Sequence, residues 1–338
     1  MNTSCVGAAL AAAALLSGGA LAQSGVKLEP GVNAGVAAAQ AFPNRPIRVV
    51  VPWAPGGIND TSARLLAQHM TASMGQPIVV DNRGGAASTI GTDIVAKSAP
   101  DGHTLLYTDL TATAVNAAAY PKLPYDTLKD LTPVTMVGVS PMFLVVHAAV
   151  PAKTVQEYVA LAKAKPGTLN YASAGNGSTS HLVGEMFRIA AKIDIAHVPF
   201  KGSGPATISL VSGEVGMHFS ASPPILPHIK SGALRALATT LPRRSSIMPE
   251  VPALAEIYPG VQIFILSGVV APTGVPRERI AYLGAEIAKA AQLPEVQRRF
   301  EVLGLETRTS TPAALGAFVE TEITRLGKLI RETGTKLD

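Results

Sequence analysis

The feature that most constrains the fold is a repeated alternation between short apolar runs and stretches in which apolar residues recur at helical spacing. Residues 47–51 are rich in β-branched side chains and predict a buried strand. A helix is predicted over 61–74, with Asp60 as its N-cap and Gly75 as its terminator. Further strands are predicted at 78–80 and 104–107. Strands that alternate with helices are typical of a doubly wound, mostly parallel α/β sheet.

The same alternation restarts in the second half of the chain. Strands are predicted at 143–147, 169–172, 195–198, 215–219, 234–238 and 264–271. Helices are predicted at 158–165, 181–191, 205–212 and near 226–230, and then, with no further strand, at 277–291, 294–303 and 312–332. A closing block of helices most simply covers an earlier sheet. We therefore expect residues 42–142 with 264–338 to form one lobe and residues 143–263 to form the other.

Composition supports a folded binding protein and argues against nucleic-acid recognition. Of the 338 residues, 47% are hydrophobic and 15% are charged, which is enough apolar material for packed cores. Aromatic residues make up 5%, and the densest basic clusters are the pairs Arg243-Arg244 and Arg298-Arg299. We therefore expect no nucleic-acid partner. The net charge of +5 is compatible with steering an anionic small molecule, although ordinary solubility explains it equally well.

The N-terminal segment predicts export. Residues 5–22 form an Ala-rich apolar run that ends in Ala20-Leu21-Ala22, the pattern of a signal peptide and its cleavage site. A second small-residue site precedes Phe42, so residues 1–41 are interpreted as a signal and leader. No Lys or Arg precedes the run, and no later stretch is long and apolar enough to span a membrane. Cys5 is the only cysteine and lies inside this segment, so we expect neither disulfides nor cysteine-ligated metal.

The loop after the first strand is a candidate anion site. A strand ends, the backbone turns on two glycines, and a helix begins, whose first N–H groups have no partner within the helix. Glycine also lets a ligand approach the backbone closely. Taken alone, the loop is more typical of an ordinary tight turn than of a binding site. Its candidate ligand contacts are Ala54, Pro55, Gly56, Gly57, Asn59 and Asp60.

A second Gly/Ser-rich loop follows the strand at 169–172 and has the same form. Its hydroxyl groups can donate hydrogen bonds to carboxylate oxygens, which only accept them. One such loop in each lobe predicts a shared ligand cleft between the lobes. The candidate contacts are Ser173, Ala174, Gly175, Asn176, Gly177, Ser178, Thr179 and His181. Residues just after other strand ends are expected to face the same cleft, and these are Thr108, Asp109, Thr111, Phe200, Lys201 and Ser220.

Enzymatic motifs are missing from the sequence. No Gly-x-Ser-x-Gly elbow and no Gly-Lys-Ser/Thr phosphate loop occurs, and the histidines lack metal-ligand spacing. Ser178 and His181 lie three residues apart, and an exported serine hydrolase is the alternative reading of that pair. We predict no catalytic residues, no metal site and no cofactor.

Several ordered segments carry a resemblance to a known family. They are Val51-Pro52-Trp53-Ala54-Pro55-Gly56-Gly57, Val80-Asp81-Asn82-Arg83, Ala99-Pro100-Asp101-Gly102-His103-Thr104-Leu105-Leu106, Asn170-Tyr171-Ala172-Ser173-Ala174-Gly175-Asn176-Gly177-Ser178, and His197-Val198-Pro199-Phe200-Lys201-Gly202-Ser203-Gly204-Pro205. With these segments, the chain from about Phe42 onward resembles the substrate-binding proteins of tripartite tricarboxylate transporters, the Bug receptors.

The resemblance implies a periplasmic receptor with two α/β lobes that close on a ligand like a Venus flytrap. It implies that residues 54–60 and 173–179 hold the carboxylate of a di- or tricarboxylate, aromatic or related organic acid. It also implies delivery to a membrane permease with one large and one small subunit; a receptor for a membrane sensor is the alternative. The protein is expected to be monomeric. Ser220 stands where an Asp is common in the family, which disfavours an amine-bearing ligand.

Overall fold

Two mixed β-sheets organise the described part of the chain. The computed structural model describes residues 42–333 except Ala54, Pro121, Gly177 and Lys201, so the predicted signal and leader lie outside the described residues. The first sheet contains, in spatial order, β11 (Glu306–Thr307), β4 (Leu131–Ser140), β10 (Ile265–Pro272), β3 (Thr104–Asp109), β1 (Ile47–Val51) and β2 (Ile78–Asn82). The second contains β7 (Ala196–Pro199), β6 (Asn170–Ser173), β8 (Met217–Ala221), β5 (Met142–His147) and β9 (Leu234–Thr239).

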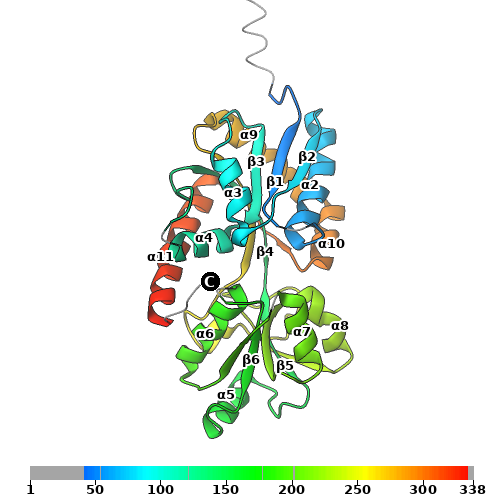
Figure 1. Ribbon diagram of the computed structural model, residues 1–338. Helices are drawn as coiled ribbons and strands as arrows, with labels where there is room; N and C mark the ends of the chain where they lie inside the picture. Colours follow the sequence, from blue (N-terminus) through cyan, green and yellow to red (C-terminus); the bar gives the residue numbers. More distant parts are fainter. Residues whose placement is uncertain (1–41, 54, 121, 177, 201, 334–338) are drawn as a thin grey trace, which may run out of the picture. The chain divides into compact units, whose positions relative to one another are not determined.

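Helices flank both sheets (Figure 1). Those that accompany the first sheet are α2 (Ile58–Met74), α3 (Thr89–Ala96), α4 (Leu110–Ala119), α9 (Arg277–Ala291), α10 (Pro294–Val302) and α11 (Pro312–Thr333). Those that accompany the second are α5 (Val155–Ala164), α6 (Thr179–Ala191), α7 (Ser203–Val211) and α8 (Ser222–Lys230). Short 3-10 turns occur at Ala86–Ser88 and Leu254–Glu256. None of these described helices combines the length and apolar character needed to cross a membrane.

Both sheets contain more antiparallel pairing than the sequence suggested. Strand β1 lies parallel to β2 and β3, and β6 lies parallel to β7 and β8. In contrast, β10 is antiparallel to both β3 and β4, and β5 is antiparallel to β8 and β9. The reason is topological: β4 leads out of the first sheet and β10 leads back into it, so the two run in opposite directions.

The chain crosses between the sheets at one narrow place. Strand β4 ends at Ser140 and β5 begins at Met142, so a single residue separates a strand of one sheet from a strand of the other. The returning strand β10 begins at Ile265, which pairs with Ser140. The outgoing and returning segments are therefore hydrogen-bonded side by side at the crossing.

Several local details differ from the sequence prediction. Strand β4 was not predicted, because Pro133 interrupts its β-branched run; Pro133 sits at a register shift opposite Val270, where a proline is tolerated. Helix α2 begins at Ile58 with Gly57 as N-cap, one turn earlier than predicted, and Asp60 lies in its first turn. The short strand β11 interrupts the block predicted to contain helices only.

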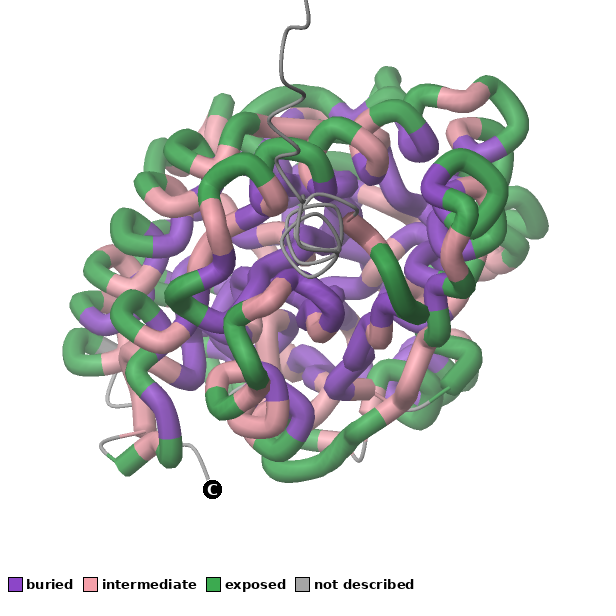
Figure 2. The backbone as a smooth tube through the Cα atoms, turned by 90° about the horizontal axis from the view of Figure 1, so that it is seen from above, coloured by how far each residue is buried: buried purple, intermediate pink, exposed green. Residues whose placement is uncertain are grey.

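Apolar side chains fill the interior of each sheet-and-helix layer. Figure 2 shows the buried segments inside and the exposed turns at the periphery. One cluster joins the second sheet to the end of α11: Tyr171 and Phe187 belong to it, and so do Leu326 of α11 and Val115 of α4. Helix α11 contacts both α4 and α6. The C-terminal helix thus packs against elements of both sheets.

Gly184 provides a test of the packing around the second sheet. It lies in α6, and a Cβ at this position would overlap the ring of Tyr171, which is held by a hydrogen bond to Glu185 and by stacking on His197. We predict that Gly184→Ala lowers the free energy of unfolding by about 1–3 kcal/mol, measured by urea denaturation. Gly204 in α7 meets nothing within 4 Å of an added Cβ.

Gly204→Ala is therefore the matched control. It should leave stability unchanged or raise it by about 0.4–1 kcal/mol, because alanine reduces the freedom of the unfolded chain. Equal stability of the two variants would contradict the packing described for Gly184.

Candidate functional site

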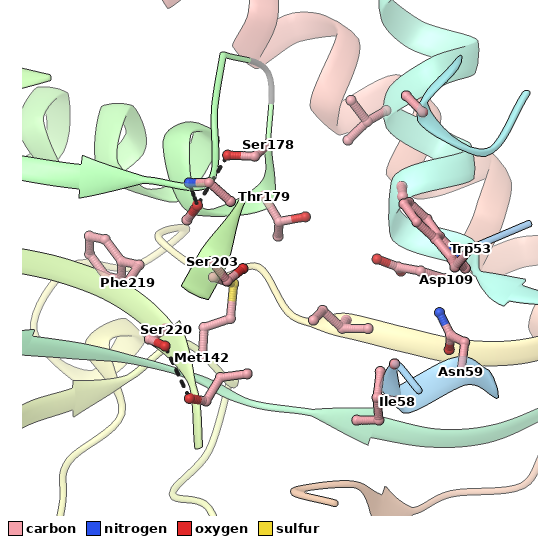
Figure 3. A pocket seen from close by; sticks show the side chains of 18 of the residues that line it. Trp53, Ile58, Asn59, Asp109, Met142, Ser178, Thr179, Ser203, Phe219 and Ser220 are labelled. Atoms are coloured by element: carbon pink, nitrogen blue, oxygen red, sulfur yellow. Dashed lines mark hydrogen bonds between the residues drawn. The ribbon is translucent and has the colours of Figure 1, made fainter. Parts of the chain in front are cut away.

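A cavity of about 490 Å³ lies where elements of the two sheets face each other. Its volume is within the range of small-molecule sites. In Figure 3, Trp53, Ile58, Asn59 and Asp109 lie on one side, and Ser178, Thr179, Ser203, Phe219 and Ser220 lie on the opposite side. The remaining lining residues are Gly57, Ala87, Ala112, Val115, Asn116, Tyr120, Met142, Ala174, Asn176, Ser180, Ala221 and Ile265.

The N-terminus of α2 opens onto this cavity without a side-chain cap. Its N-cap is Gly57, which is extended and has no side chain to accept a hydrogen bond from the first turn. Asp60, predicted as the cap, instead accepts the N–H of Gly56 (2.8 Å) and pairs with Arg64 (2.9 Å). Despite partial burial, these contacts hold the pKa of Asp60 below its usual value. Asp60 therefore stabilises the loop, and the helix N–H groups remain available to an anion.

Asn59 is oriented by a buried chain of hydroxyl groups. Ser267 Oγ in β10 donates to Asn59 Oδ1 (2.7 Å), and Ser62 Oγ bonds to the hydroxyl of Tyr107 in β3 (2.7 Å). Burial raises the pKa of Tyr107, so its hydroxyl stays neutral. Because Oδ1 is already occupied, the amide nitrogen of Asn59 is the group left for a ligand, and it lies on the cavity side in Figure 3.

The second predicted loop is closed by its own hydrogen bonds. Ser178 caps α6 by accepting from the N–H of His181 (3.3 Å), and its hydroxyl donates to the carbonyl of Gly175 (2.7 Å). Ser180 Oγ accepts the N–H of Ala174 (2.9 Å). Beside these bonds, Ala174, Asn176, Ser178, Thr179 and Ser180 line one edge of the cavity.

A histidine pair lies behind that loop. The rings of His181 and His197 are stacked 3.9 Å apart, and His197 Nε2 bonds to Ser173 Oγ (2.6 Å). Burial, together with the neighbouring His181, lowers the pKa of His197 to about 4. The stacking turns His181 toward His197, while the Ser178 hydroxyl donates to a carbonyl, so the geometry does not assemble the nucleophile and base that the alternative hydrolase reading requires.

Helices α7 and α8 bring further uncapped ends to the same cavity. Their N-caps are Gly202 and Ala221, and neither provides a side-chain hydrogen bond. Ser203, at the first position of α7, and Ala221 line the cavity, as does Ser220, whose hydroxyl donates to the carbonyl of Ala221 (3.2 Å). Pro223 and Pro224 have no N–H group, so the first turn of α8 offers few backbone donors. The N–H groups at the start of α7 therefore face those of α2 across one space.

Asp109 is the sole carboxyl group among the described lining residues. It is the last residue of β3 and the N-cap of α4, and its Oδ1 accepts the N–H of Thr111 (2.9 Å). The side chain is 6% exposed and points into the cavity in Figure 3. Burial raises the pKa of Asp109 to about 7, although backbone N–H bonds from Ala112, Thr111 and Leu266 oppose that shift. The group therefore changes charge near neutral pH.

The structure brings together part of the predicted set. Eight predicted residues line the cavity: Gly57, Asn59, Asp109, Ala174, Asn176, Ser178, Thr179 and Ser220. Pro55, Gly56, Asp60, Thr108, Thr111, Ser173, Gly175, His181 and Phe200 are not among its lining residues. Ala54, Gly177 and Lys201 lie outside the described residues. Ligand contact by any of these residues remains a prediction.

The sequence analysis missed the apolar wall of the cavity. Met142 and Ile265 lie at the crossing between the sheets, and Phe219 lies in β8. Trp53 and Ile58 flank the first glycine loop. Their position beside strand ends and glycines was the available signal, but an apolar residue there is more often part of a core than of a cavity.

Two mixed β-sheets with flanking helices, and a cavity between them, form the architecture of a periplasmic binding protein. The predicted fold class is thereby confirmed. A solved structure described as a periplasmic transporter superposes with a TM-score of 0.76 at 36% identity, covering 88% of this chain and 100% of that chain. Residues 62–335 match the tripartite tricarboxylate transporter family receptor, and the chain belongs to this family. The family predicted from sequence is thereby confirmed.

Individual relatives agree with this assignment. Protein BugT of Bordetella pertussis is 41% identical over 310 residues, covering 90% of this chain and 95% of BugT. MatC from Rhodopseudomonas palustris, solved with bound malate, has a TM-score of 0.71 and 34% identity, covering 86% of this chain and 100% of MatC. The protein is a solute-binding receptor of the tripartite transporter type, and the prediction that it is not an enzyme is confirmed by that family membership.

The raised pKa of Asp109 predicts how stability depends on pH. The pKa rises from 3.8 to about 7 on folding, so between these values the native state binds more protons than the unfolded chain. The free energy of unfolding should therefore fall as pH rises through that window, by up to about 4 kcal/mol. Asp109→Asn keeps a capping oxygen and removes the titration.

The measurement is urea unfolding of ligand-free protein and variant at several pH values from 4.5 to 7.5. The stability of the variant minus that of the wild type should grow with pH. Taking this difference cancels the opposite contribution of His197 and His218, whose pKa values are lowered to about 4 in both proteins. A difference that does not change with pH would contradict a raised Asp109 pKa.

Proposed function

We propose that this receptor captures a small organic carboxylate in the periplasm, in the cavity between the two sheets. The observation that carries the proposal is the convergence on one space of two helix N-termini without side-chain caps, α2 from one sheet and α7 from the other. Carboxylate oxygens accept hydrogen bonds, and backbone N–H groups at a helix start donate them. The malate-bound structure of MatC supports the same ligand class.

The donors are arranged to receive a carboxylate from two sides. On the first side are the N–H groups at the start of α2 and the amide nitrogen of Asn59. On the second are the start of α7 at Ser203 and the polar edge that includes Ser178 and Thr179. Each hydrogen bond to a charged group contributes about 1.5–3 kcal/mol, so a few such bonds suffice for specific binding.

The apolar wall suits the body of an organic acid. Trp53, Ile58, Met142, Phe219 and Ile265 can cover carbon atoms of the ligand while the donors hold its carboxylate. The proposed ligand contacts are the eight residues predicted from sequence that line the cavity. To these we add Ala54 of the first glycine loop, Gly177 of the second loop, and Lys201, which follows strand β7 in the sequence. No cofactor or metal takes part in this function.

We further propose that residues 42–142 with 264–338 and residues 143–263 act as two lobes that close on the ligand. The narrow crossing at Ser140 and Met142, hydrogen-bonded to the returning strand, supports a hinge at this position. The closed receptor then docks, as a monomer, on the permease subunits of a tripartite transporter. Export depends on the predicted signal at residues 1–41.

A ligand screen tests the proposal. Malate, citrate, adipate and benzoate should be compared with their uncharged amides and with neutral sugars in a thermal-shift assay of the mature chain. At least one carboxylate should raise the melting temperature by several degrees, because a ligand that binds only the native state stabilises it. The amides and sugars should have no effect. Stabilisation by sugars or amides with silence from every acid would overturn the proposal.

Asn59 offers a residue-level prediction. Asn59→Asp preserves shape but replaces the donor that faces the cavity with a second acceptor, so carboxylate affinity should fall by about 10–100-fold in calorimetry. Asn170→Asp is the matched control. Asn170 bonds to the N–H of Gly216 and lies outside the cavity, so this variant should bind normally. Unchanged affinity in Asn59→Asp would remove Asn59 from the site.

A further inference from the structure

The cavity contains an acidic group where an anion is expected to bind. Asp109 lies on the same side as Asn59 and Trp53, with its carboxyl directed into the space (Figure 3). Its backbone partners are N–H groups of its own helix and of Leu266 in β10, and Ser267, the next residue, pairs with Asp109 across the strands. An ionised carboxylate here would repel the carboxylate of a ligand within the same low-dielectric space.

Among the described residues, the elements packed against Asp109 contribute no positively charged side chain that pairs with it. Helix α4 and strand β10 contain no ionisable residue. The charged or titratable groups on the other neighbouring elements bond to other partners. Arg48 pairs with Asp81, Asp60 with Arg64 and Asp93 with Lys97, and Tyr107 is hydrogen-bonded to Ser62. His69 lies partly buried on α2, three turns from the N-cap Gly57. His181, which does not line the cavity, stacks on His197, and Tyr120 is the other titratable residue among the described lining residues.

Two chemical solutions exist for an acid in this position. Either the ligand brings a cationic nitrogen that pairs with the carboxylate, or the carboxyl holds a proton and donates it in a hydrogen bond to the ligand. The convergence of helix N-termini favours an anion throughout the cavity, and burial already stabilises the neutral carboxyl, with a pKa of about 7 in the empty site. Both observations favour the second solution.

Building on the proposed function, we propose that Asp109 makes ligand capture proton-coupled: its carboxyl group, protonated from solvent, donates a hydrogen bond to the carboxylate of the ligand. Above neutral pH, free Asp109 and the free ligand are both ionised. Formation of the complex therefore takes up one proton from solvent. Short hydrogen bonds between a carboxylic acid and a carboxylate are of the strong, charge-assisted kind. Asp109 thereby sets the pH range of capture and selects an anionic over a cationic ligand group.

The test is isothermal titration calorimetry of wild-type receptor with malate, citrate, adipate and benzoate, in phosphate and in imidazole buffer at pH 6, 7 and 8. The difference in heat between the two buffers reports the number of protons taken up. Uptake should rise from about 0.1 proton per ligand at pH 6 to about 0.9 at pH 8, after correction for the titration of the ligand itself. Affinity should weaken by up to tenfold per pH unit above 7.

Variants assign the proton to its residue. Asp109→Asn keeps a donor at all pH values, so proton uptake should vanish and affinity should become independent of pH. Asp109→Ser, which also caps a helix, is a second variant in case the first fails to fold. Asp126→Asn is the control, because Asp126 also accepts backbone N–H bonds, from Leu128 and Lys129, but is exposed and outside the cavity. It should behave as wild type.

The outcomes separate the two proposals. Carboxylate binding without proton uptake, or uptake that persists in Asp109→Asn, overturns the role of Asp109 and leaves the proposed function intact. Proton release on binding also overturns it and indicates a ligand nitrogen paired with ionised Asp109. If none of the four carboxylates binds at any pH, the proposed function fails and this inference fails with it.

Discussion

The antiparallel pairing of β4 with β10 is the constraint on which the rest of the structure depends. It runs from Leu131 and Pro272 at one end to Ser140 and Ile265 at the other, where the chain passes between the sheets. The two segments that connect the sheets are thus fixed side by side, and Met142 and Ile265 become the part of the cavity nearest to the crossing. The cavity exists where it does because both connections pass through one point.

Local sequence patterns were sufficient for most elements but not for the connections. Strand β1 and helix α9 have the predicted bounds, since a β-branched run identifies the one and apolar residues at helical spacing identify the other without tertiary information. Strand β4 escaped prediction because Pro133 is admitted only by a register shift against β10, a partner more than a hundred residues away. Helix α4 escaped because it begins directly at the end of β3, with Asp109 serving both elements.

The site was predictable to the extent that it depends on helix starts. Gly57, Asn59 and Ser178 could be selected because strand-to-helix turns are visible in sequence, and the family resemblance added that both loops serve one ligand. The apolar wall could not be selected, because Phe219 and Met142 look like ordinary core residues until two sheets face each other. The burial of Asp109, which decides its charge, likewise depends on packing that no local pattern reveals.

The caps of α2 and α7 are glycines, so the donors at these helix starts belong to the backbone. A substitution changes a side chain but leaves an N–H group in place, unless it introduces proline or bends the turn. In the proposed site, recognition of the acid group is thereby little affected by most point mutations, whereas the apolar side chains that line the cavity are free to vary. A receptor built this way can acquire a new ligand by exchanging wall residues while its hold on the carboxylate is inherited unchanged.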